Sequence, residues 1–202
     1  MLILASASKA RLELLKSVGI YPDKIINTNI NEASKKGEKP LHYVSRIALE
    51  KNKAVQKKQA EIVLTADTIV ALGRRIIQKP NDKEEALYFL NLLSGRRHKV
   101  HTSICIFSKE KYYQKNVTTT LKMKRLSDEE KKCYLLSDEW KGKAGGYSIQ
   151  GAASYFFPFI SGSYSNVVGL PLTETVGMLL GIGFKIPKFL NGLKNECCNR
   201  TC

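Results

Sequence analysis

Residues 62–78 read IVLTADTIVALGRRIIQ, and this stretch decides how the chain can fold. Ile62 to Leu72 is rich in β-branched residues, which favours a strand. Gly73-Arg74 predicts a tight turn, and Arg75 to Gln78 predicts a strand that returns along the first. Asp67 interrupts the apolar run, so the same stretch also contains a candidate for chemistry.

Outward from this hairpin, strands alternate with helices. Strands are expected at Leu2 to Ala5, Ile25 to Asn29, His98 to Phe107, Tyr112 to Met123 and, briefly, around Tyr155 and Asn166. Helices are expected at Ser8 to Val18, Pro40 to Gln59, Asp82 to Leu93, from Ser127 onward, and Leu172 to Leu180. Two stretches are joined as hairpins, so we predict an α/β fold with a mixed sheet flanked by helices.

The bulk properties favour one domain with an acidic partner. A chain of 202 residues suits a single core, which we place at 1–187, followed by a polar tail at 188–202 that we expect to be mobile. The formal net charge is +15, which fits nucleic acid, a membrane surface or a polyphosphate substrate. The lysines are scattered rather than gathered in one block, which argues against nucleic acid.

Neither membrane insertion nor secretion is indicated. The most apolar region, Val167 to Phe184, is interrupted by glycines, a proline and a glutamate. The five cysteines form no C-x-x-C pair and share no metal-ligand spacing with histidine. We therefore expect a cytoplasmic protein.

The first strand-to-helix junction, LASASKARLELL, is a candidate anion site. Ser6 and Ser8 fall where the first helix begins, and its free N–H groups and dipole favour an anion. Lys9 and Arg11 lie in the first turn, where a cation opposes the dipole unless an anion lies between. The alternative is that Ser8 is an ordinary N-cap.

Charged residues on faces expected to be buried are further candidates for ligand binding or catalysis. Lys51 interrupts the apolar stripe of the helix that begins at Pro40, so it either reaches to the rim or points at a ligand. Asp67, beside Thr68, is costly in an apolar strand unless it is paired or bound to a metal, although a hydrogen-bonded structural role is the alternative. Lys79, at the end of the return strand, and Glu32 could join this acid.

A glycine-rich block, Ala144 to Leu172, combines glycines, which permit positive φ, with polar side chains that include Gln150. It either wraps a small ligand or makes tight turns between strands. His98 and His101 are three residues apart on an expected strand, so their side chains point to opposite faces and a shared metal is not favoured.

These segments together resemble the Maf family of septum-formation-inhibitor-like nucleoside triphosphate pyrophosphatases. The matching motifs occur in family order: LASASxxRxELL, NEA at Asn31 to Ala33, YVSRIALEK at Tyr43 to Lys51, ADTIV at Ala66 to Val70, KP at Lys79-Pro80, LSGRRHKVHTS from Leu92, KAGGYSIQG from Lys143 and ISGSYSNVVGLPL from Ile160.

The resemblance implies an elongated mixed sheet like that of the inosine-triphosphate pyrophosphatases, with two lobes around a cleft. It also implies hydrolysis of nucleoside triphosphates to monophosphates and pyrophosphate with a divalent cation (Mg, Mn or Co). Asp67 then corresponds to the catalytic acid, and Asp67 and Glu32 to the metal-side carboxylates. The substrate-binding positions implied are Ser6, Ser8, Arg11, Lys51, Thr68, Lys79 and Gln150.

The resemblance also implies a substrate preference, and departures from the family motifs leave an alternative function open. YSIQG is similar to the branch acting on dTTP and UTP rather than on 7-methyl-GTP, with pool sanitation and division arrest as the implied roles. The chain has SKAR where the family has SPRR, and GKAG where it has DKAG. A catalytically weak, nucleotide-binding regulator of septation is therefore the alternative. We expect no nucleic-acid or membrane partner, and a homodimer is left open.

Overall fold

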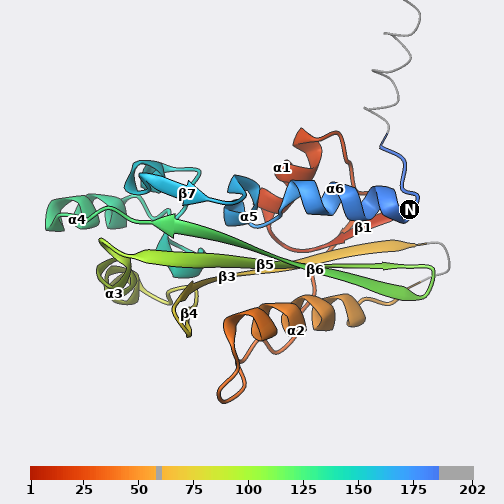
Figure 1. The fold of residues 1–202 in the computed structure, drawn as a ribbon, viewed down its shortest axis with the longest axis horizontal. Coiled ribbons are helices and arrows are strands. Elements are labelled where there is room, and N and C mark those ends of the chain that lie inside the picture. Colours follow the sequence, from red (N-terminus) through yellow and green to blue (C-terminus); the bar gives the residue numbers. More distant parts are fainter. Residues whose placement is uncertain (58–60, 187–202) are drawn as a thin grey trace, which may run out of the picture.

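The computed structural model describes residues 1–57 and 61–186, and in these ranges seven strands form one mixed sheet (Figure 1). The sheet order is β2-β1-β3-β5-β6-β7, with β4 paired to β3. The strands are β1 (Leu2–Ala5), β2 (Lys24–Ile26), β3 (Ile62–Leu72), β4 (Arg75–Ile77), β5 (Arg97–Ser108), β6 (Lys111–Lys122) and β7 (Phe159–Ser161). The α-helices are α1 (Lys9–Ser17), α2 (Pro40–Lys53), α3 (Lys83–Leu93), α4 (Asp128–Leu136), α5 (Tyr164–Val168) and α6 (Leu172–Gly181). Short 3-10 helices occupy Ala144–Gly146 (η1) and Ala152–Phe156 (η2).

Strand β3 joins two differently built parts of the sheet. Its first residues, 62–64, pair in parallel with β1, and its last residues, 70–72, pair antiparallel with β4. Along its other edge β5 runs antiparallel from 63 to 71. Among the described residues, positions 65–69 therefore have no strand partner on the β1/β4 edge. This gap lies where the parallel strands β1 and β2 end, which is where ligands bind in many α/β sheets.

Helices cover both faces of the sheet. Helix α2 lies along one face, and α1 and α6 lie on the other (Figure 1). Because side chains alternate along a strand, successive residues of β3 meet different helices. Thr65 donates a hydrogen bond to the Ala48 carbonyl of α2, whereas Thr68 contacts Arg11 of α1.

Two large apolar clusters form the ends of an elongated molecule. One gathers around α3 and α4 and includes Val70, Leu90 and Phe156. The other packs β1 against α1 and α6 and includes Leu4 and Leu179. The predicted α/β class, with a mixed sheet, flanking helices and two lobes, is confirmed. The domain limits at 1–187 stay a prediction, and the tail at 188–202 lies outside the described residues.

Most expected elements are present, with two errors near the C-terminus. Tyr155 lies in η2 and Asn166 in α5, so the short strands expected there were wrong. The helix at Asn166 forms because the Ser163 hydroxyl accepts a hydrogen bond from its backbone N–H, which caps a single turn. Helix α2 also ends earlier than expected, at Lys53.

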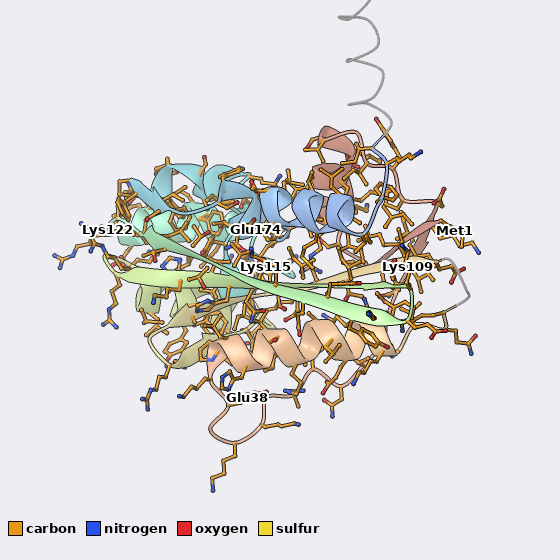
Figure 2. The ribbon with its side chains drawn as sticks, turned by 45° about the vertical axis from the view of Figure 1, so that its right-hand side comes forward. Met1, Glu38, Lys109, Lys115, Lys122 and Glu174 are labelled. Carbon is orange, nitrogen blue, oxygen red and sulfur yellow. The ribbon has the colours of Figure 1, made fainter. Side chains whose placement is uncertain are left out.

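Exposed lysines lie on several separate elements, among them Lys24 of β2, Lys115 of β6 and Lys132 of α4. Figure 2 shows Lys109, Lys115 and Lys122 spaced along the β5–β6 hairpin. Across residues 1–57 and 61–186, the structure contains no helix with the length and apolar character needed to cross a membrane.

Candidate active site

A cavity of about 900 Å³ opens beside the gap in β3. Its walls come from the loops after β1 and β2, from α2 and β3, and from the segments after β4 and around η1. All nine residues singled out in the sequence line it: Ser6, Ser8, Arg11, Glu32, Lys51, Asp67, Thr68, Lys79 and Gln150. Tertiary folding thus brings together positions spread over most of the chain, although their individual roles stay predictions.

The cavity contains a lysine that lies between two acids. Nζ of Lys51 lies 2.7 Å from Oδ1 of Asp67 and 2.8 Å from Oε1 of Glu32. The side chains of Lys51 and Asp67 are 12% and 9% exposed, whereas that of Glu32 is 44% exposed. Lys51 therefore neither reaches to the rim nor stands free toward a ligand, the two outcomes considered from its sequence. Its first partners are carboxylates.

Buried hydrogen bonds hold Lys51 and Asp67 in register. Asn52, the next residue of α2, is fully buried and donates to the carbonyl oxygens of Val63 (2.9 Å) and Cys105 (3.0 Å). Thr65, two residues before Asp67, donates to the Ala48 carbonyl of α2 at 2.8 Å. These bonds fix the helix over the strand, so the ion pair is set by backbone anchoring as well as by charge.

The loop that carries Glu32 is tied to α2 by two side chains. The Tyr43 hydroxyl donates to the Glu32 carbonyl oxygen at 2.7 Å, and burial raises the pKa of this tyrosine to about 12. Arg46 donates to Glu38 from both Nε and Nη2 at 2.7 Å, and this pairing lowers the pKa of Glu38 to about 2. The acid at position 32 is therefore held by its backbone, although its side chain is half exposed.

Arg11 connects three segments on the other face of β3. Its guanidinium donates to the Gly169 carbonyl (2.8 Å), to Ser6 Oγ (3.0 Å) and to Thr68 Oγ1 (3.0 Å). Burial lowers the pKa of this guanidinium, and the nearby carboxylates of Asp67 and Glu32 oppose that shift. Ser8 is the N-cap of α1, because its hydroxyl accepts from the Arg11 N–H. The ordinary capping role is thus confirmed, beside a place in the cavity wall.

The glycine-rich block forms the remaining wall. Tyr147 and Gln150 line the cavity, and the buried hydroxyl of Tyr147 lies 2.8 Å from Nε2 of His98. Burial lowers the pKa of His98 to about 4 and raises that of Tyr147. His101 instead lies 2.8 Å from Thr118 Oγ1. The two histidines have separate partners, as their spacing indicated.

Sequence reasoning left several wall residues out of the site. Lys9, Asn27, Thr28, Tyr43 and Lys143 also line the cavity. The position of Lys9 in the first turn of α1 was a usable signal, and Lys143 begins the KAGGYSIQG motif. Asn27 and Thr28 follow β2 and belong to no recognisable sequence motif. They line the cavity because β2 pairs with β1.

Glu32 and Asp67 fit a divalent cation that is bound jointly by the protein and by substrate phosphates. Within residues 1–57 and 61–186, no group of three or more His, Cys, Asp or Glu is arranged to hold a metal ion. Magnesium, however, is commonly bound by one or two carboxylates together with substrate phosphates. Glu32 and Asp67 are close enough to share the ammonium of Lys51, so the pair fits such a substrate-completed site.

Comparison with known proteins gives a consistent picture. The family model described as "Maf-like protein" matches residues 1–182. A dTTP/UTP pyrophosphatase of Roseobacter denitrificans is 50% identical over 185 residues, covering 92% of this chain and 98% of that protein. One from Cereibacter sphaeroides is 51% identical over 182 residues, covering 90% and 95%. A nucleoside triphosphate pyrophosphatase of Neorickettsia sennetsu is 49% identical over 185 residues, covering 90% and 88%.

Solved structures overlap this chain in part. The Ham1 protein of Staphylococcus aureus matches with a TM-score of 0.38 and 16% identity, covering 60% of this chain and 71% of that one. A nucleoside-triphosphatase described as a dITP/XTP pyrophosphatase, from Mycobacterium abscessus, matches with a TM-score of 0.35 and 13% identity, covering 62% and 75%.

Proposed function

This chain belongs to the Maf family, and we propose that it hydrolyses nucleoside triphosphates to nucleoside monophosphates and pyrophosphate, with dTTP and UTP as preferred substrates. The observation that carries the proposal is that all nine expected residues line one cavity. A buried acid, several cations and a polar glycine-rich wall meet there. Relatives near half identity over nearly their whole length support the same reaction.

The chemistry follows from the charges around Asp67. Its Oδ1 is occupied by Lys51, and no hydrogen bond or ion pair within the described residues involves Oδ2. That second oxygen can orient a water molecule and accept its proton as the water oxygen bonds to phosphorus. The bond between the α- and β-phosphates breaks in the same step, and pyrophosphate leaves with the electron pair. Positive side chains stabilise the charge that builds on it.

A divalent cation is part of the proposal. Glu32 and Asp67 would hold it together with the substrate phosphates, and it would supply Lewis-acid stabilisation of the phosphate oxygens. Because Lys51 occupies both carboxylates, its ammonium must move aside or share them when this complex forms. A phosphate oxygen is the natural next partner for the displaced ammonium. Thr68 and Gln150 remain the residues proposed for substrate choice.

The test is a hydrolysis panel with the parent chain and Asp67→Asn. Canonical, 5-methyl and 7-methyl triphosphates are incubated with Mg, Mn or Co, or with chelator alone, and pyrophosphate and monophosphate are quantified. We expect dTTP and UTP to react fastest, chelator to abolish turnover, and Asp67→Asn to lower kcat by about 100-fold or more, as loss of a positioned acid–base group does.

The matched control is Asp138→Asn, which removes an exposed acid outside the cavity and should hydrolyse like the parent. Equal rates for Asp67→Asn and Asp138→Asn would contradict the role of Asp67. A parent that binds triphosphate but releases no pyrophosphate would instead favour the alternative function, a regulator of septation.

Partners and location complete the proposal. The described cysteines, Cys105 and Cys133, are free thiols, which suits a cytoplasmic protein. Exposed lysines on several separate elements, among them β2, β6 and α4, support the expectation of no nucleic-acid partner. The homodimer left open by the sequence stays a proposal that sedimentation of the full chain would test.

A further inference from the structure

The cavity carries more positive charge than its internal ion pairs use. Five basic side chains line it, against two acidic ones. Lys51 forms ion pairs with both acids, Glu32 and Asp67. Arg11 donates hydrogen bonds only to uncharged oxygen atoms of the described residues. Within the described part of the chain, Lys9, Lys79 and Lys143 have no hydrogen-bond or ion-pair partner for their ammonium groups. Three uncompensated ammonium groups around one cavity form a site for a polyanion.

Lys143 is held firmly in this wall. Its side chain is half-buried, and its backbone N–H donates to the Trp140 carbonyl at 3.1 Å. The N–H of Gly145 donates to the Gln78 carbonyl at 3.0 Å, which joins the segment of Lys143 to the segment of Lys79. Gly145 has φ +76°, and a Cβ there would lie 2.9 Å from Val70 Cγ2. The close packing of Gly145 fixes the backbone position of this segment, and with it the backbone of Lys143.

Lys9 reaches the cavity from the opposite part of the sequence. It is the first residue of α1 and directly follows the N-cap, Ser8. The N-terminal end of a helix repels a cation, and α1 has no acidic residue in its first turn to offset this. An anion bound in the cavity removes that conflict. Helix termini and cationic side chains together are a common arrangement for phosphate.

We propose that Lys9 and Lys143, with Lys79, bind the phosphates that leave as pyrophosphate. The inference rests on the proposed function and adds two residues to its substrate-binding set. Asp67 and Lys51 form the end of the site where the water reacts, so the uncompensated lysines are available to the rest of the phosphate chain. Lys9 and Lys143 then contribute affinity for phosphate rather than for the base.

The test compares Lys9→Ala and Lys143→Ala with matched variants. Lys16→Ala lies on the same helix as Lys9 but pairs with Glu13, and Lys141→Ala lies two residues from Lys143 but pairs with Asp138. We measure KM for dTTP and inhibition constants for inorganic pyrophosphate and dTMP. Each cavity variant should raise KM and the pyrophosphate constant about tenfold, as loss of one charge-assisted hydrogen bond does, with dTMP changed less than about twofold.

Lys143→Arg should keep most of the pyrophosphate affinity, because it keeps the charge. Pyrophosphate inhibition equal to that of the Lys16→Ala and Lys141→Ala controls would overturn the inference while leaving the proposed function standing. So would equal losses for pyrophosphate and dTMP with a lowered Tm. If the parent hydrolyses no triphosphate, the proposed function fails, and direct titration of each variant with pyrophosphate still decides the role of the lysines.

Discussion

At the scale of single residues, the site is organised by how buried charges are matched. Lys51 is 12% exposed and contacts two carboxylates, so removing it would leave the buried carboxylate of Asp67 without its ion-pair partner and near a second negative charge on Glu32. The pair Arg11 and Thr68 joins α1 to β3 without any carboxylate. A site built in this way holds its acid in place before substrate arrives, and leaves other cations free to bind phosphate.

His98 gives a prediction about pH and stability. Burial lowers its pKa to about 4 in the folded protein, below its ordinary value of 6.5. The unfolded chain therefore binds more protons between these values, so stability falls as pH drops from about 6.5 to about 4, by at most about 3 kcal/mol. His101, whose pKa burial also lowers, contributes with the same sign.

We expect His98→Gln to lose less stability over this pH range than the parent, because glutamine does not titrate there. Urea unfolding at a series of pH values measures the difference. His42→Gln, at an exposed position, is the control and should follow the parent. Parallel curves for the parent and His98→Gln would contradict a neutral, buried imidazole.

At the scale of elements, α2 and β3 work as one unit. The helix brings Lys51 and the strand brings Asp67, and their register depends on Asn52 and Thr65 rather than on the ion pair alone. Neighbouring apolar contacts of Tyr43, Val44 and Ile47 with Ile69 bury the same interface. Precise placement of the acid is therefore a property of the packed pair of elements.

Asn52→Ala tests this coupling. The substitution removes the donor that reaches the carbonyl oxygens of Val63 and Cys105, both in the sheet. Leaving buried acceptors without that donor should cost about 1–3 kcal/mol of unfolding free energy, measured in urea. Because Lys51 is the adjacent residue, kcat should also fall. Asn29→Ala, at an exposed position, should change neither quantity. Loss of stability with unchanged kcat would show that the helix position is set elsewhere.

At the scale of the whole molecule, the formal net charge is +15, and the cavity is lined by five basic side chains against two acidic ones. The dispersed lysines raise the potential everywhere and favour the approach of any anion. In the cavity, cations come from α1, from the end of the β4 hairpin and from the segment before η1. The dispersed lysines thus attract anions to the protein, whereas the cavity cations bind a particular anion.

Ionic strength should accordingly affect binding more than chemistry. Raising salt from about 50 mM to about 200 mM shortens the screening length, so KM for dTTP should rise several-fold with kcat nearly unchanged. Sucrose at matching osmolality is the control and should leave KM unaltered. Duplex DNA added at the higher salt concentration should not inhibit, because screening weakens its attraction to the dispersed lysines. A kcat that falls with salt while KM stays constant, or strong inhibition by DNA, would contradict this account.

Much of the architecture could be predicted because it depends on local pattern. The β-branched run predicted the strand β3. Asp82 and Ser127, where two helices were expected to begin, are the N-caps of α3 and α4. The failures at Tyr155 and Asn166 occurred in a block of glycines, aromatics and serines, where short strands and single capped turns have similar local preferences. At Asn166, the Ser163 cap and hydrogen bonds from the Asn166 side chain to the Val100 carbonyl of β5 and to Thr119 of β6 stabilise the helical turn.

The sequence by itself determined which residues were candidates, because an acid or a lysine in an apolar run is costly without a partner and therefore conspicuous. Only the tertiary structure determined which residues are the partners of these acids and lysines. Lys51 meets Asp67 and Glu32 because α2 packs across β3, and Lys9 and Lys143 share a cavity because β1 and β4 leave the middle of β3 uncovered. Charge compensation depends on distances of a few ångströms between segments far apart in the chain, and those distances exist only in the folded molecule.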